Sequence, residues 1–235
     1  MNRLDRLAFR TARAAARRRG SRPALHPDGV IVTGRIEVPA RATRWDVPWL
    51  DTPGSHAVTA RWSRAAGLPR PLPDGAGLAL RVADADGPGR PLDLLLTTSG
   101  RGRWSRHVPL PRTSATAGPY STLLPYVVGG RRGVLAVFPE PGAPRVPADP
   151  AVVGAAATAV RPLAFRLCFG TGGAWRPLAR LSLLGEGPAA RSQDGEAFDP
   201  YRNLLPDLRP VDRLRALRVA AYAGSRAGRH AGAPG

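Results

Sequence analysis

The chain has 235 residues, 43% of them hydrophobic, which suits one domain with a real core and excludes wholesale disorder. The 35 basic and 17 acidic residues give a net charge of +18, and every basic residue is an arginine. This charge could attract anionic surfaces, but the abundance of Arg, Ala, Pro and Gly also fits the codon bias of a GC-rich genome.

The single cysteine, Cys168, excludes an internal disulfide and a cysteine zinc cluster. It stands in the apolar run 162–169, so we expect a small core side chain there. No apolar stretch approaches the 18 residues that a membrane span needs, and none follows the basic N-terminus as a signal peptide would require. The cytoplasm is therefore the expected compartment.

Residues 2–19 carry apolar side chains at helical spacing and arginines elsewhere, and Gly20 ends the pattern. We expect residues 1–20 to form a basic helical arm that packs on the domain or on a second subunit. A membrane-surface or nucleic-acid arm is the alternative. Residues 21–235 are expected to form the remaining, single domain.

The next part of the chain, residues 29–96, favours short strands separated by turns that are rich in Gly, Pro and Asp. Strand patterns also occur at 163–169 and 175–184. A short helix broken by Pro125 is expected at 120–128, and a strand or buried helical turn at 133–138. A loop is expected at 139–150 and a helix at 210–223. This order predicts an α+β fold with an antiparallel β-barrel and flanking helices.

A histidine motif stands at the start of the first predicted strand. His26 is followed by Gly29 after three residues, by Gly34 after eight, and by Glu37-Val38 after eleven and twelve. A lone histidine before a strand is more often structural than functional, so the spacing of the glycines carries the interpretation.

Two later segments complete the pattern. One holds Arg61-Trp62-Ser63, followed by the segment 74–82. The other is an arginine–tyrosine motif in the last predicted helix, in which Arg218 precedes Tyr222 by four residues, Ser225 follows by three and Arg229 by seven. Residues four apart share one helix face, so a guanidinium would lower the free-energy cost of a phenolate at Tyr222. Alone, Tyr222 would be a packing aromatic.

Together these segments resemble the distal and proximal segments of haem catalases, and 198–210 is similar to the Phe-Asp-Pro-Trp segment of small catalase-like proteins. The resemblance covers residues 22–98 and 198–230. It implies a catalase-type barrel that binds haem b, with Tyr222 on the C-terminal helix as the iron ligand. It further implies that His26 is the distal histidine, that Ser63 orients it, and that cofactor contacts come from Arg22, Arg61, Arg218 and Arg229.

The sequence departs from the family at two places. Catalases have an asparagine opposite the histidine, just after a strand ending Asp-Leu-Val-Gly. Here Asp93-Leu-Leu-Leu96 is followed by Thr97 and Thr98, whose hydroxyls are weaker anchors for peroxide. The arginine expected three residues before the histidine is replaced by Pro23, and Arg22 lies one place earlier. Losing one positioned donor commonly costs about 10²–10³ in rate, so the resemblance favours peroxidase or organic-hydroperoxide activity over fast dismutation.

Alternatives remain open at this point. The fold could persist without catalysis, having lost haem or only storing it. The charge and the tryptophans Trp45, Trp62 and Trp104 beside arginines would suit single-stranded nucleic acid, although no such motif is recognisable. The His26-Pro-Asp28 pair could ligate a phosphodiesterase metal, but no second ligand cluster accompanies it. A homo-oligomer is possible.

Overall fold

The computed structural model describes residues 29–69, 71–160, 162–186 and 198–211. Within these residues the chain is mostly antiparallel strand with three short helical segments: β1 (Gly29–Val38), α2 (Pro48–Asp51), β2 (Gly54–Arg64), β3 (Ala76–Val82), β4 (Leu92–Thr98), η1 (Ser105–His107), β5 (Tyr120–Ser121), β6 (Tyr126–Val128), β7 (Arg131–Pro139), α3 (Pro150–Ala157), β8 (Leu163–Thr171), β9 (Ala174–Glu186) and β10 (Leu208–Pro210).

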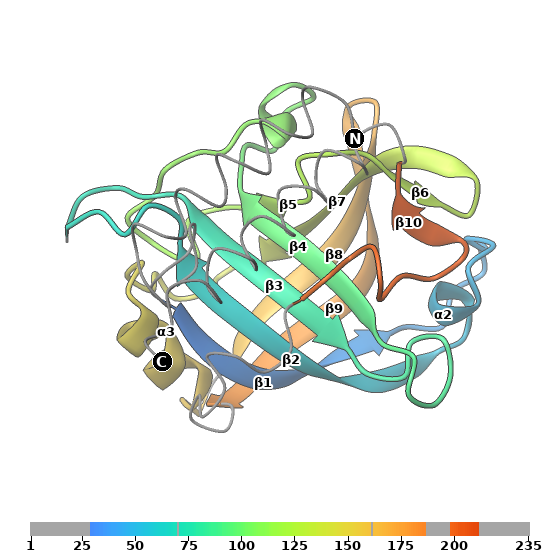
Figure 1. The fold of residues 1–235 in the computed structure, drawn as a ribbon, viewed down its shortest axis with the longest axis horizontal. Helices are drawn as coiled ribbons and strands as arrows, with labels where there is room; N and C mark the ends of the chain where they lie inside the picture. The colour runs from blue at the N-terminus through green and yellow to red at the C-terminus, as the bar shows by residue number, and fades with distance from the viewer. Residues whose placement is uncertain (1–28, 70, 161, 187–197, 212–235) are drawn as a thin grey trace, which may run out of the picture. The chain divides into compact units, whose positions relative to one another are not determined.

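Eight of these strands close into a barrel. The hydrogen-bonded order β7-β5-β4-β3-β2-β1-β9-β8 returns to β7, because β7 also pairs with β8 (Figure 1). β6 pairs with residues 131–133 of β7, and β10 pairs with β6. The predicted antiparallel β-barrel is therefore confirmed.

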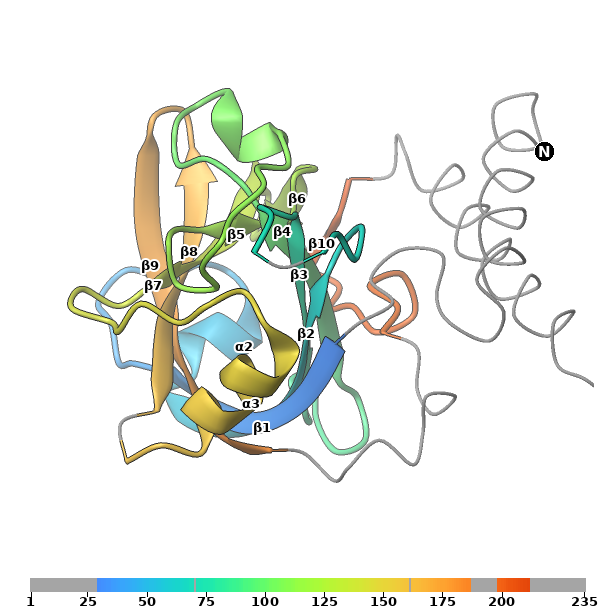
Figure 2. The ribbon, with the colours of Figure 1, turned by 90° about the vertical axis from the view of Figure 1, so that its left-hand side faces the viewer.

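Alternate side chains of each strand fill the barrel, as the two-residue period of a strand requires. The interior positions are apolar and nearly inaccessible to solvent: Val32, Ile36, Val58, Ala60, Trp62, Leu78, Leu80, Leu94, Leu96, Leu135, Val137, Leu167 and Leu181. Helix α3 lies at one end of the barrel and α2 at the other (Figures 1 and 2). Their buried residues, Trp49 and Leu50 in α2 and Val153 in α3, join the same core.

The backbone requires glycine at two points of the sheet. Gly129 and Gly130 both have positive φ and form the two-residue turn between β6 and β7, as hairpins with primed turns require. At Gly34 the register between β1 and β9 shifts, and an added Cβ would collide with the carbonyl oxygen of Ser182. Gly34 is thus required by strand packing.

The strand predictions for 29–96, 163–169 and 175–184 are confirmed, and 133–138 is strand rather than helix. The helix expected at 120–128 is wrong. Leu123 has a φ of 56° and Pro125 interrupts the run, so the segment forms two short strands, β5 and β6.

Two further differences concern helix positions. The loop expected at 139–150 is followed by a helix, α3, that was not expected. Asp149 caps the start of this helix, because its carboxylate accepts a hydrogen bond from the Ala151 N–H. Pro210 was expected to begin a helix, but it ends β10 instead. The rest of that helix and the N-terminal arm lie outside the described residues.

Cys168 is a buried core residue, as predicted. It is 6% exposed and packs with Ala136 and Phe138 on the outer side of β7 and β8. Burial raises the pKa of the Cys168 thiol to about 11, so the thiolate form is scarce at neutral pH.

A hydrogen-bonded pair of aromatic residues lies inside the barrel. Trp62 Nε1 donates to the Tyr120 hydroxyl over 2.9 Å, and that hydroxyl donates to the Ala115 carbonyl over 2.6 Å. Burial raises the pKa of Tyr120 to about 12, because a phenolate there would lose its solvation.

We expect Tyr120→Phe to lower the free energy of unfolding at pH 7 by about 1–3 kcal/mol, since Trp62 Nε1 would be left buried without its acceptor. The stability of the natural chain should fall as pH rises from about 10 to about 12, because the unfolded chain releases the Tyr120 proton first. The difference between the two proteins should therefore narrow over that range. Urea unfolding at several pH values measures it, and a constant difference would contradict the assignment.

Candidate functional site

A row of small side chains crosses the outer face of the barrel at the end where β1 begins. Gly29 pairs with Ser63, Ser63 with Gly77 and Gly77 with Thr97. Paired residues of antiparallel strands point to the same face, and the neighbouring core residues Trp62, Leu78 and Leu96 point inward. We call these four residues the small-residue row.

Arg61 lies in the next outward-facing row, beside the small-residue row, where it pairs with Ile31 and Ala79. A Cβ on Gly29 would come within 2.9 Å of Arg61 Nη2 and 2.7 Å of the Trp62 carbonyl oxygen. Gly29 therefore leaves room for the guanidinium over the start of β1. Burial lowers the pKa of Arg61, because its charge loses solvation there.

The two candidate threonines face opposite sides of β4. Thr97 belongs to the small-residue row and is half-buried. Thr98 is fully buried, and its hydroxyl accepts a hydrogen bond of 3.0 Å from the Ala76 N–H. Of the two predicted residues, only Thr97 shares a face with Arg61 and Ser63.

An ion pair that the sequence reasoning missed stands further along the same outer face. Arg81 and Asp93 are cross-strand partners on β3 and β4, and their two hydrogen bonds measure 2.8 and 2.7 Å. The Asp93 carboxylate also accepts from the Asp199 N–H at 2.7 Å and from Asn203 Nδ2 at 2.9 Å. It is inaccessible to solvent.

This carboxylate fixes the segment 198–203 on the sheet. The Arg81 guanidinium also lies 5.2 Å from the centre of the Phe198 ring, and the Asp93 N–H donates to the Asn203 carbonyl. The segment is the first part of the stretch 198–210, whose sequence resembles the Phe-Asp-Pro-Trp segment of small catalase-like proteins. Opposite charges on neighbouring predicted strands were the available signal, but it becomes specific only when the strand register is known.

Five of the predicted site residues lie outside the described residues: Arg22, His26, Arg218, Tyr222 and Arg229. The chain order places His26 three residues before Gly29, the first member of the small-residue row. Their roles remain predictions. The structure brings together Arg61, Ser63 and Thr97, and it separates Thr98 from them.

Comparison with known proteins shows the fold. No known sequence family and no curated protein matches the chain. Catalase A from Saccharomyces cerevisiae superposes with a TM-score of 0.65 at 11% identity, over 88% of this chain and 60% of that one. A fungal catalase gives 0.61 at 11% identity, over 87% and 58%.

A bacterial catalase gives a TM-score of 0.61 at 12% identity, over 87% of this chain and 56% of that one. The chain thus spans less than two thirds of each of these structures. The protein has a catalase-type fold, as the sequence resemblance implied. No helix in the described part of the chain has the length and apolar character needed to cross a bilayer.

Asp93→Asn should lower the free energy of unfolding by about 3 kcal/mol, because the buried Arg81 charge loses its partner. The matched control is Asp86→Asn, which removes an exposed ion pair with Arg90 and should cost less than about 1 kcal/mol. Thermal and urea unfolding measure both. Equal effects of the two substitutions would show that the Asp93 pair does not hold the segment 198–203.

Proposed function

We propose that this protein binds haem b on the outer face of its barrel and reacts there with peroxide. The observation that carries the proposal is the small-residue row with Arg61 beside it, at the end of the barrel that His26 precedes in sequence. The catalase-type fold supports it, and so does the spacing of the Tyr222 motif.

The described residues fit one side of such a cofactor. Gly29, Ser63 and Gly77 carry little or no side chain, so the backbone of three neighbouring strands suits contact with a planar group, and Ser63 and Gly77 are buried, as residues under such a group would be. The guanidinium of Arg61 matches the carboxylate of a haem propionate. When bound, the haem iron supplies the redox chemistry that peroxide cleavage needs.

In this proposal the chain itself moves the proton. His26 takes the proton from one peroxide oxygen and delivers it to the other, since imidazole titrates close to neutral pH. Ser63 accepts or donates a hydrogen bond that orients the imidazole. Thr97 offers its hydroxyl to the peroxide. Tyr222 would hold the iron as a phenolate, and Arg218, four residues earlier in the sequence, would stabilise that charge.

The alternatives are weakened to different degrees. Trp45 and Trp62, two of the three tryptophans on which the nucleic-acid interpretation depended, are buried and cannot stack on bases. Trp104 is 77% exposed. A non-enzymatic haem protein differs from the proposal only in reactivity, so the experiments below measure binding and reaction separately.

Reconstitution of the protein with haem tests whether Tyr222 is the iron ligand. The purified chain should give a Soret band with haem, and Tyr222→Phe should abolish or shift that band because the phenolate ligand is lost. The matched control is Tyr201→Phe, a tyrosine in the segment 198–203, which should leave the spectrum unchanged. A Soret band that does not depend on Tyr222 would overturn the assignment of the iron ligand.

His26→Ala should retain the haem spectrum but slow the reaction with peroxide by about 10²-fold or more, because the proton carrier is lost. Stopped-flow absorbance with hydrogen peroxide and with an organic hydroperoxide measures the rate. Unchanged reactivity in a haem-loaded His26→Ala protein would favour the non-enzymatic alternative.

Substitutions at Thr97 test the effect of the asparagine amide that catalases have in this region. Thr97→Asn should raise the rate of oxygen release from hydrogen peroxide by about tenfold or more, because an amide donor is restored. Thr97→Val keeps the volume, removes the hydroxyl and should slow the reaction. Both variants should keep the Soret band. If neither changes the rate, Thr97 has no contact with the peroxide.

A further inference from the structure

A second site lies at the opposite end of β1 from Gly29. A pocket of about 740 Å³ opens between the segment that follows β1 and the outer side of β8 and β9. Its apolar wall is formed by Val38, Pro39, Trp45, Pro177 and Leu178. This volume lies within the range of small-molecule sites, which is about 300–1,000 Å³.

One part of the pocket wall holds two guanidinium groups close together. Arg166 and Arg180 are cross-strand partners on β8 and β9. The Glu140 carboxylate lies between them, 3.2 Å from Arg166 Nε and 3.9 Å from Arg180 Nε. One carboxylate therefore faces two cations. Both arginine side chains are about half exposed, at 46% and 60%, so a second anion can reach them.

Arg41 adds a cation that is held in place by the backbone. Its Nη1 donates to the Pro177 carbonyl over 3.4 Å, and its Nη2 donates to the Leu178 carbonyl. Its Nε is buried without a hydrogen-bond partner, and burial lowers the pKa of the guanidinium. Asp51 favours the charged form from a distance, but none of the ion pairs in the described part of the chain includes Arg41. The group is thus positioned, poorly solvated and available to an anion.

The pocket as a whole carries a net positive charge. Four arginines line it, Arg41, Arg166, Arg176 and Arg180, against two glutamates, Glu37 and Glu140. An apolar wall beside an excess of guanidinium groups fits a ligand with an apolar body and an anionic head. Inorganic phosphate alone would leave the wall of Val38 and Trp45 unused.

We propose that this pocket binds an amphipathic organic anion, which is a carboxylate or phosphate monoester carried on an apolar chain or ring. The inference is independent of the haem proposal, because the pocket is built by residues 37–45, 140 and 166–180 alone. Carboxylate and phosphate heads share the same guanidinium chemistry, so both are included in the test.

The experiment titrates the full-length chain by calorimetry with decanoate, decyl phosphate, decanol and inorganic phosphate, each below its aggregation limit. The two amphipathic anions should bind at least about tenfold more tightly than decanol, because their charged heads form charge-assisted hydrogen bonds with the guanidinium groups. Comparison of their heads distinguishes a carboxylate ligand from a phosphate ligand. Equal binding of decanol, or tighter binding of inorganic phosphate, would overturn the proposal.

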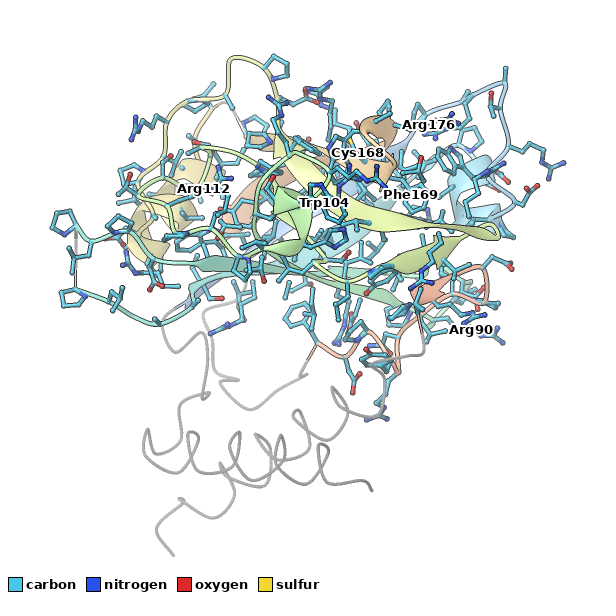
Figure 3. All side chains as sticks on the ribbon, turned by 90° about the horizontal axis from the view of Figure 1, so that it is seen from above. Arg90, Trp104, Arg112, Cys168, Phe169 and Arg176 are labelled. Atoms are coloured by element: carbon cyan, nitrogen blue, oxygen red, sulfur yellow. The ribbon has the colours of Figure 1, made fainter. Side chains whose placement is uncertain are left out.

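Substitutions of the pocket arginines test whether the ligand binds beside them. The double substitution Arg166→Gln with Arg180→Gln should weaken the binding of decanoate or decyl phosphate by about tenfold or more. The single substitution Arg176→Gln, at an exposed position where it cannot disturb the core, should weaken this binding less. The control is Arg90→Gln, since Arg90 lies away from Arg176 (Figure 3) and should have no effect. Unchanged affinity in both pocket variants would overturn the proposal. So would a change of oligomeric state in them, measured by light scattering, which would assign the pocket to a second copy.

Discussion

Closure of the barrel is the constraint on which the other features depend. Once β7 pairs with β8, every strand must send alternate side chains into a filled interior. The remaining side chains face outward, and they decide what the protein can bind. Arg61, Ser63 and Thr97 share a face because they occupy outward positions of paired strands. A slip of one residue in any pair would turn these side chains into the core.

Much of the barrel could be predicted from sequence, because its strands combine alternating apolar residues with Gly, Pro and Asp turns. Prediction failed where other forces decide. Residues 120–128 contain Leu and Tyr that suit a helix, but Pro125 and the pairing with β7 and β10 impose strands. Helix α3 was missed because its Ala-rich sequence follows a proline-rich loop, although Asp149-Pro150 is an ordinary helix start.

The site could be predicted only in part. The identity of Arg61 and Ser63 as candidates came from the resemblance, whereas their common face follows from register, which sequence alone leaves open. Register also separates Thr97 from Thr98, which stood as equal candidates. The Arg81–Asp93 pair and the pocket at Arg41 unite residues from distant parts of the chain, and their partners are visible only in three dimensions. Gly34 was part of the spacing that suggested a haem site. The structure gives it a packing role instead, because a Cβ there would collide with β9.

The strand at the edge of the sheet determines how easily a second chain could pair with its backbone. Among the described strands, β10 ends the sheet, and it is three residues long with a proline at its last position. A proline has no N–H to offer a neighbouring chain, and a strand of this length presents few backbone groups. The described edge of the sheet therefore offers a second chain few backbone groups with which to pair.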